Sequence, residues 1–291
     1  MNHPRSRLVA VGLVSLSLAA CVSQPASNAK SNAQLTPATK ITKDLLRLPE
    51  PKGKVAVGVY ALRDQTGQYK PAPDSSFSTM VTQGATSMLV KALKDTGWFI
   101  PVERENLQNL LTERKIVRAL EGPQDKGGTT TLQLPPLMPA TVLIEGGIVA
   151  YETNVRTGGV GARYLGVGVS DQYRVDQVTV NLRTIDIRGG QILNSVSTTK
   201  TIYSHQLSSG VYRFVNFKQL LELEAGYTRN EPVQLCVREA IESAVVHLAV
   251  QGMKDRVWLL KDDKDIESPI VQAYLKEGSD LASGASDKAD D

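Results

Sequence analysis

Residues 155–175, VRTGGVGARYLGVGVSDQYRV, decide the fold of this chain. From Leu165 onward, apolar side chains occupy every second position except Asp171, and glycine or polar residues occupy the positions between them. Residues 160–164 alternate with the opposite parity, which predicts two strands that reverse direction near Tyr164 and Leu165. Each strand then has one apolar and one polar face, as in a hairpin that contacts two different surroundings.

A second segment, residues 203–229, has the same character. Tyr212 and Phe214 flank Arg213, so both rings are predicted on one face of a strand. A turn is expected near residues 216–218. After that turn, apolar residues alternate with polar or small ones. The apolar positions are Leu221, Leu223, Ala225 and Tyr227, and the positions between and after them are Glu222, Glu224, Gly226 and Thr228.

Both segments are long enough for membrane hairpins. Each arm approaches the roughly 9–11 tilted residues that a strand needs to cross a bilayer. Tyr212, Phe214 and Tyr227 lie near the predicted hairpin ends, where aromatic side chains favour the membrane interface. Four strands cannot close a barrel, and open strand edges are not tolerated in lipid, so inserted hairpins require several copies of the chain. Amphipathic strands of a soluble sandwich are the alternative.

The N-terminus predicts a secreted lipoprotein. Arg5 and Arg7 precede a short apolar stretch, so residues 1–20 are expected to be a cleaved signal peptide. Residues 18–21 read LAAC, a lipobox that makes Cys21 the first mature residue and the site of acylation. Val22 in place of Asp indicates outer-membrane sorting. The alternative is an ordinary signal peptide with a chance cysteine.

The rest of the chain predicts a compact α/β domain. Its expected parts are a tether over residues 21–43, a first part over 44–154, strands over 176–202, a helical part over 230–277 and a disordered tail over 278–291. Expected helices are residues 78–95, with Ser78 as N-cap, 104–120, and 232–251, opened by Pro232; Gly97 follows the first of these. Expected strands are residues 54–62, 99–102, 142–151, 178–187 and 191–202, the last after a Gly189–Gly190 turn.

Composition excludes several functions. The net charge of +3 is too small to indicate nucleic-acid binding, and the mean hydropathy is −0.17. His205 and His247 lack metal-site spacing, so neither a metal nor another cofactor is expected. Cys236 has no partner once Cys21 is acylated, and its apolar helical surroundings predict a small buried side chain.

The sequence gives little support for an enzyme. Residues 159–164, GVGARY, nearly match a dinucleotide fingerprint, but Tyr164 stands at the last glycine position. These glycines also lie within a predicted strand pair and do not precede a helix. No G-x-S-x-G nucleophile motif accompanies the histidines.

Four long blocks resemble the CsgG family of curli secretion lipoproteins. They are KVAVGVYALRDQTGQYKPAPDSSFST at residues 54–79, LQNLLTERKI at 107–116, TGGVGARYLGVG at 157–168 and LLELEAGYTRNEPVQLC at 220–236. The resemblance extends over roughly residues 43–258.

The resemblance implies the architecture and the partners. We expect a ring, by family a nonamer, in which each copy contributes a periplasmic α/β domain and two transmembrane β-hairpins to one oligomeric outer-membrane β-barrel. The implied cargo is unfolded curli subunits, exported without ATP. The implied partners are the periplasmic cap CsgE and the surface factor CsgF.

The resemblance also implies a pore constriction. The family lines it with Tyr, Asn and Phe, and the matching positions here are Ala72, Ser76 and Phe77. Ala72 and Ser76 are smaller than the Tyr and Asn of the family, so the constriction should be wider at Ala72. Glu222 and Glu224 are expected to form acidic rings in the lumen. The second interpretation is a soluble periplasmic lipoprotein that binds partners without forming a pore.

Overall fold

The computed structural model describes residues 35–70, 78–120, 134–157, 163–164, 167–168, 172–207, 211–214 and 231–286. Pro37–Asp291 form one compact unit. Among the helices in these ranges, none has the length and apolar character that crossing a membrane requires.

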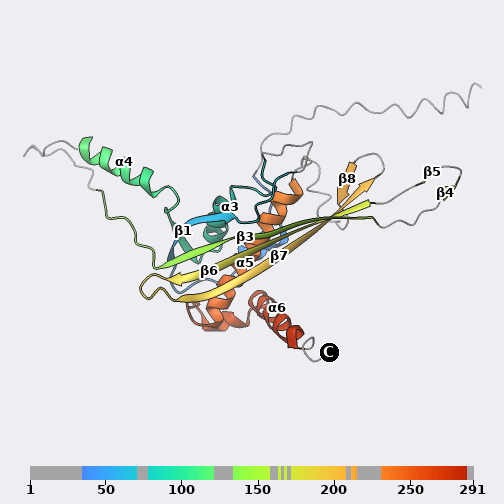
Figure 1. Cartoon of the computed structure of the whole chain (residues 1–291). Helices are drawn as coiled ribbons and strands as arrows, with labels where there is room; N and C mark the ends of the chain where they lie inside the picture. The colour runs from blue at the N-terminus through green and yellow to red at the C-terminus, as the bar shows by residue number, and fades with distance from the viewer. Residues whose placement is uncertain are drawn as a thin grey trace, which may run out of the picture. The chain divides into compact units, whose positions relative to one another are not determined.

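A six-stranded mixed sheet forms the centre of the unit (Figure 1). Its order is β2-β1-β3-β6-β7-β8. β1 is parallel to both β2 and β3, and the pairs from β3 to β8 are antiparallel. The strands are β1 Val55–Asp64, β2 Phe99–Val102, β3 Val142–Thr157, β6 Gln172–Asp186, β7 Ile192–Leu207 and β8 Val211–Phe214; β4 Arg163–Tyr164 and β5 Val167–Gly168 form a separate pair.

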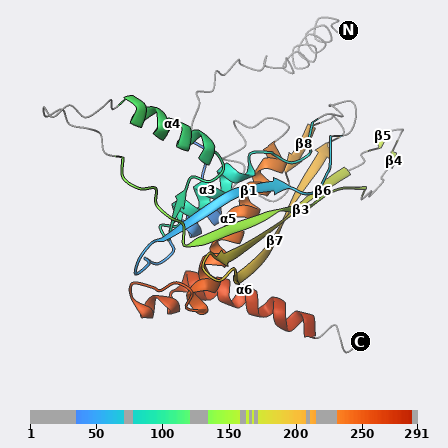
Figure 2. The ribbon, with the colours of Figure 1, turned by 60° about the vertical axis from the view of Figure 1, so that its left-hand side comes forward.

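Most of the helices pack on this sheet or on one another. The helices are α2 Lys40–Leu45, α3 Ala85–Asp95, α4 Leu107–Leu120, α5 Glu231–Lys254 and α6 Pro269–Ser286, with a short 3₁₀ turn over Asp263–Glu267. α5 crosses one face of the sheet at β6 and β7, and α2, α3 and α6 contact α5 in turn (Figure 2). α4 has no buried residue.

The core forms where α5 meets the sheet. Side chains on alternate positions of β6, Val178, Val180 and Leu182, are fully buried. α5 is buried on several sides, as a helix with apolar residues all round must be. Its fully buried residues include Cys236, Val237, Ile241, Ala244, Val245, Val246, Leu248 and Ala249. The opposite face of β7 is exposed at Ser195, Ser197 and Thr199.

Several sequence predictions are confirmed. β2 covers residues 99–102 as predicted, and Gly97 follows α3 with a φ of +74°. α5 begins at Glu231, so Pro232 lies in its first turn. Cys236 is fully buried. β4 and β5 pair antiparallel with Tyr164 opposite Val167, which agrees with the predicted reversal at Tyr164 and Leu165.

Other boundaries were predicted wrongly. α3 begins at Ala85 and not at Ser78, because Ser78 and Met80 form backbone hydrogen bonds with Lys70 and Gln68 instead of starting a helix. α4 begins at Leu107 and not at residue 104. α6 continues to Ser286, so the tail predicted as disordered from residue 278 is helical over its first nine positions. Its polar, glycine-containing sequence resembles a disordered tail, but the helix begins upstream on apolar residues and propagates into it.

The predicted tether also ends too late. α2 begins at Lys40, inside the predicted tether, and Thr39 caps it: its hydroxyl accepts from the Thr42 backbone, and the Thr42 hydroxyl accepts from the Thr39 backbone. β3, β6 and β7 each join a predicted core strand and part of a predicted hairpin segment into one strand, because their ladders continue beyond the α5-covered core. The chain also reverses between Leu207 and Val211, which the sequence did not predict.

Replacing Gly252 should destabilise the domain. A Cβ at this position of α5 would overlap the indole ring of Trp258, which is 4% exposed. Gly252→Ala is therefore expected to lower the free energy of unfolding by about 1–3 kcal/mol, the usual cost of overpacking a core. Denaturant titration of the purified protein measures this change.

Gly278→Ala is the matched control, since Gly278 is also helical and a Cβ there meets open space. It should leave stability unchanged or raise it by up to about 1 kcal/mol, because alanine favours the helix. Equal stability changes in the two variants would contradict the packing explanation.

Candidate functional site

The segment predicted to form the constriction is closed at its base. The loop residues 71–77, which include Ala72, Ser76 and Phe77, lie outside the described residues, but both arms that lead to them are described. The Lys70 backbone N–H donates to the Ser78 carbonyl at 2.8 Å, and the Met80 N–H donates to the Gln68 carbonyl at 2.9 Å. Tyr69 and Thr79 face each other as an antiparallel bridge. The loop is therefore clasped by a short two-stranded ladder.

The N-terminal arm is attached to β3. The parallel pairing of β1 with β3 ends where Asp64 lies opposite Ile148. Just beyond it, the Gln65 N–H donates to the Ile148 carbonyl at 2.9 Å. The Gln68 side-chain amide then donates to the Tyr151 carbonyl at 2.7 Å. A backbone bond and a side-chain bond thus continue the ladder past the end of β1.

A turn at Asp64 shapes the start of this arm. The carboxylate of Asp64 accepts from both the backbone N–H and the hydroxyl of Thr66, at 2.9 and 2.7 Å. Such a local carboxylate turn holds the backbone without help from a second strand. Gln83, on the other arm, donates to the same carboxylate at 3.3 Å.

A β-bulge lies in β3 beside the attachment. Ile148 pairs with Val180 and Ala150 with Thr179, so Val149 is an extra residue in β3. Bulges re-aim the side chains that follow them, and they are common next to functional sites. The buried apolar side chains of β3 before Val149 are at even-numbered positions (Val142, Ile144 and Ile148), and Tyr151 is buried after it. The bulge therefore turns Tyr151 into the core.

Buried Tyr151 and Asp176 form a polar cluster with exposed Thr153. The hydroxyls of Tyr151 and Thr153 donate to one carboxylate oxygen of Asp176, at 3.1 and 2.8 Å. Thr153 and Asp176 lie directly opposite each other in the β3–β6 ladder. Asp176 is 2% exposed and Tyr151 is 1% exposed. A buried carboxylate is tolerated only when hydrogen bonds satisfy it, so this cluster holds β3 and β6 in one register.

A second buried network attaches the N-terminal helix to the core. The Glu242 carboxylate on α5 accepts from the Thr42 hydroxyl at 2.7 Å and from the Arg238 guanidinium at 2.9 Å. Arg238 also donates to the Thr42 hydroxyl at 2.9 Å. Thr42 and Glu242 are buried, so α2 is held to α5 by charge-assisted bonds in addition to Leu45.

The C-terminal helix contacts α5 through His247. The His247 Nε2 atom lies 3.4 Å from the Glu277 carboxylate of α6, and its ring packs edge-on against Tyr274. The Tyr274 hydroxyl donates to Asp44 at 3.1 Å. Burial lowers the pKa of His247, and the neighbouring Glu277 opposes that shift. Burial also raises the pKa of Tyr274, with a further contribution from the negative charge of Asp44.

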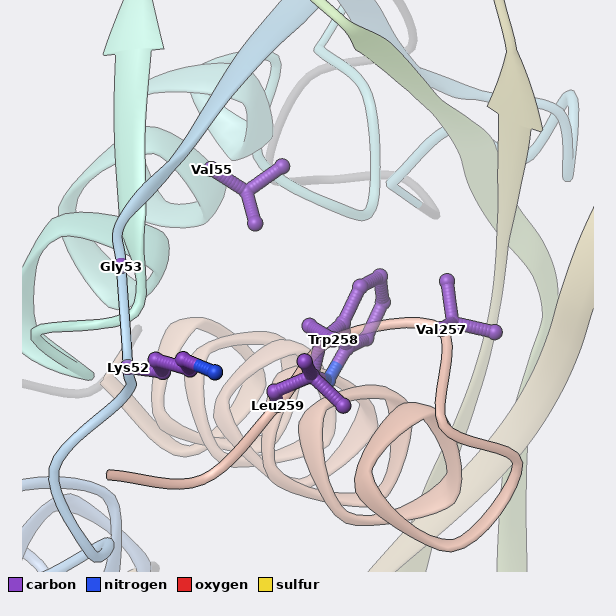
Figure 3. Close-up of a pocket in the computed structure, with 6 residues that line it drawn as sticks. All are labelled: Lys52, Gly53, Val55, Val257, Trp258 and Leu259. Atoms are coloured by element: carbon purple, nitrogen blue, oxygen red, sulfur yellow. The ribbon is translucent and has the colours of Figure 1, made fainter.

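Reactive chemistry is not favoured at the described residues. Burial, and next the negative charge of Asp176, raise the pKa of the Cys236 thiol, which keeps it a neutral thiol. No cluster of histidine, cysteine or carboxylate side chains with metal-binding geometry occurs in these parts of the chain. A hollow of about 280 Å³ is lined by Lys52, Gly53, Val55, Val257, Trp258 and Leu259 (Figure 3). Lysine is the one titratable side chain among them, so this hollow lacks an acid–base pair.

The structure describes few of the predicted site residues. Tyr212 and Phe214 lie in β8, paired with Gln206 and Ser204 of β7. The predicted turn near residues 216–218 lies outside the described residues. So do the lipidation site, the constriction positions, the acidic pair and the third aromatic: Cys21, Ala72, Ser76, Phe77, Glu222, Glu224 and Tyr227.

Sequence reasoning missed the residues that hold the loop base. Gln68 and Tyr151 were not singled out, because a single glutamine in a loop or tyrosine at a strand end has no distinctive spacing. At Asp176 the apolar parity of the strand changes, which predicted a strand passing from one environment to another but not the hydrogen bonds of this carboxylate. A charged residue at such a change of face marks the point where a strand leaves the core.

These elements define a mixed α/β domain whose strands extend past its core, with a clasped loop beside the extension. Residues 38–278 match the family model of the curli production assembly/transport component CsgG. The chain belongs to the CsgG family. This confirms the resemblance found in the sequence blocks.

Relatives of known name agree over nearly the whole chain. The chain is 47% identical to the curli production assembly/transport component CsgG of Escherichia coli K12 over 267 residues, which cover 92% of this chain and 95% of that protein. It is 47% identical to the component of the same name from Salmonella typhimurium, over 89% of this chain and 93% of that one. The match to a PelC dodecamer structure from Paraburkholderia phytofirmans covers 73% of this chain and 91% of that chain at 13% identity, with a TM-score of 0.26.

Acidification should weaken the fold through His247. Because the pKa of His247 is lowered on folding, the folded state favours the neutral ring. The contribution of His247 to the free energy of unfolding is therefore fully present above pH 6.5 and is lost as the pH falls through the folded-state pKa. His247→Gln, which cannot titrate, should lose less stability between pH 7 and pH 5. Denaturant unfolding at several pH values measures the difference. Parallel pH profiles for the two proteins would contradict this role of His247.

Proposed function

We propose that this chain is one protomer of an outer-membrane channel that exports unfolded curli subunits without ATP. The observation that carries the proposal is the continuity of three strands. β6 and β7 pair without a break from Gln172 opposite Gln206 to Thr184 opposite Asn194. β3 follows β6 in the same way from Ala150 to Thr157. The strands of the core are therefore also the roots of the predicted hairpins at residues 155–175 and 203–229.

The strands that continue past the α5-covered core have two outer edges, at β3 and at β8. These edges explain why a barrel needs several copies of the chain. β3 pairs with β6 as far as Thr157, whereas its pairing with β1 on the other side ends at Ile148. At the far edge, β8 pairs with β7 alone among the described residues. In lipid, unpaired backbone groups at such edges cost several kcal/mol each. Pairing β8 of one copy with β3 of the next removes both edges and produces a closed ring.

The proposed constriction is formed by Ala72, Ser76 and Phe77. Support comes from the clasped base of their loop, which holds the two arms together beside the hairpin root. A collar of Phe77 rings contacts any passing side chain weakly, so an unfolded chain slides without a deep binding well. Ser76 adds a polar ring, and Glu222 and Glu224 add acidic rings that favour cations and repel acidic cargo.

The direction of export requires no catalytic residue. An unfolded subunit enclosed under the channel loses conformational entropy, and escape outward restores it. In this proposal CsgE provides the enclosing cap and CsgF acts at the surface. Acylation at Cys21 anchors the chain to the outer membrane, and the N-terminal tether leads from the anchor to α2.

Imaging tests the proposal directly. Full-length protein extracted from outer membranes in mild detergent should appear in electron micrographs as rings with a central pore and a countable symmetry, for which the family predicts nine. Monodisperse single copies would overturn the proposal. They would favour a periplasmic lipoprotein that binds partners without forming a pore.

Narrowing the loop should lower conductance. Ala72→Tyr adds a large ring at a position where the family carries tyrosine, so each copy in the ring would reduce the open cross-section. Single-channel recording in planar bilayers should show a lower conductance for Ala72→Tyr than for the natural chain. An equal or higher conductance would show that position 72 does not line the narrowest part.

A further inference from the structure

The apolar stripe of α4 is not buried among the described residues of its own chain. Leu107, Leu110, Leu111 and Val117 recur at helical spacing along one side of this helix. No residue of α4 is buried, and Leu111 is 36% exposed. Figures 1 and 2 both show α4 standing apart from the sheet. An amphipathic helix in water normally packs its apolar side on another layer of structure, so this stripe calls for a partner.

Two arginines hold α4 to the segment that returns from it to the sheet. The guanidinium of Arg114, within α4, donates to the Pro135 carbonyl. Arg104, just before the helix, donates to the Met138 carbonyl at 3.3 Å. The same Arg104 packs over Gly58 of β1, where an added Cβ would lie 3.4 Å from its Cγ atom. α4 is therefore a supported projection with a packed base on the sheet.

A group of exposed isoleucines lies on the sheet near the turn between β6 and β7. Ile185 of β6 pairs with Ile192 of β7, so the two side chains share one face. Thr184, the preceding residue of β6, is fully buried on the α5 side, so the two isoleucines lie on the opposite face. Ile192 is 52% exposed, and Ile187, which follows β6, is 45% exposed. This face therefore carries apolar side chains that α5 does not cover.

The two apolar surfaces lie at opposite edges of the sheet and in one row of paired residues. Val102, the last residue of β2, pairs with Gly58 of β1, which pairs with Leu143 of β3. Leu143 pairs with Ile185, and Ile185 pairs with Ile192. The chain therefore leaves the β2 edge toward α4 in the same row that reaches Ile192 at the β7 edge.

The proposed ring brings these two edges of neighbouring copies together. It pairs β8 of one copy with β3 of the next, on the side of β3 where β1 and β2 lie. The β2 edge of each copy, from which α4 projects, therefore faces the β7 edge of its neighbour.

We propose that α4 docks on a second copy of this chain, where its apolar stripe covers Ile185, Ile187 and Ile192. The docking rests on the proposed channel function, because the ring is what places the two edges side by side. It adds a helix layer to the sheet face that α5 leaves open. It also joins neighbouring domains through a contact that is separate from the strands of the barrel.

Leu110→Glu tests the docking, since it places an unpaired charge within the apolar stripe. Thr112→Glu is the matched control, because Thr112 is exposed on nearly the opposite side of α4. On dilution in mild detergent, Leu110→Glu rings should dissociate at a protein concentration roughly tenfold or more above that of the natural protein, the cost of burying such a charge in an interface. Thr112→Glu rings should dissociate like the natural ones. Equal ring stability in all three proteins would overturn the docking.

Denaturant unfolding separates this effect from a loss of folding. Neither Leu110 nor Thr112 is buried within the chain, so both variants should unfold at the same denaturant concentration as the natural protein. A ring defect accompanied by an equal loss of folding stability would overturn the docking as its cause.

Cross-linking tests the contact without depending on a pore. Full-length protein carrying Leu110→Cys and Ile192→Cys should form covalent dimers and higher multimers with a flexible bismaleimide, because each copy carries both halves of the contact. The pair Thr112→Cys and Ile192→Cys should stay uncross-linked. Cys236 is fully buried and common to both proteins, so it does not distinguish them.

The two proposals fail in different ways. Rings that form without the first cross-link overturn the docking and leave the channel function intact. Cross-linked multimers of a protein that forms no rings overturn the channel function, and the docking then stands as a contact between domains. Absence of both rings and cross-links overturns both.

Discussion

The packing of α5 against β6 and β7 is the contact on which the rest of the structure depends. A helix that is apolar on most of its sides cannot remain in water, and here it is covered by the sheet and by α2, α3 and α6. The Thr198 hydroxyl donates to the Ala240 carbonyl at 2.8 Å across this contact. The N-terminal helix and the C-terminal helix are both held through α5, by Glu242 and by His247. The domain is therefore built around one buried helix.

The part of the sheet that α5 covers also sets the register of the strands beyond it. Even-numbered residues of β6 face α5, and the ladders with β3 and β7 then continue without a register change into the extension. Because a one-residue slip would move every core side chain to the exposed face, burial of Val178, Val180 and Leu182 fixes the register of the whole strand. The bulge at Val149 is the local exception, and it turns Tyr151 toward Asp176 and places its carbonyl beside Gln68.

Much of the fold was predictable from residue patterns because those patterns report burial. The strand over residues 99–102, the left-handed Gly97 and the helix that Pro232 opens follow from local rules. The start of α3 was mispredicted, because Ser78 has the chemistry of a helix cap yet its carbonyl pairs with Lys70. The helical stretch beyond residue 278 was missed because α6 is nucleated upstream, where Val271 and Tyr274 pack on the core. Of the candidate site, the sequence indicated the loop and the strand faces, but not the residues that hold the loop base.

By itself, the sequence determined the membership of the CsgG family, the alternation of the strands and the central apolar helix, because these depend on residue type and spacing along the chain. The tertiary structure alone decided which residues hold the loop base. Gln68 and Tyr151 are separated by 83 positions, and Tyr151 and Asp176 by 25. Hydrogen bonds over such separations leave no local pattern. They exist because the end of β1 and the bulge in β3 bring the Gln68 amide to the Tyr151 carbonyl.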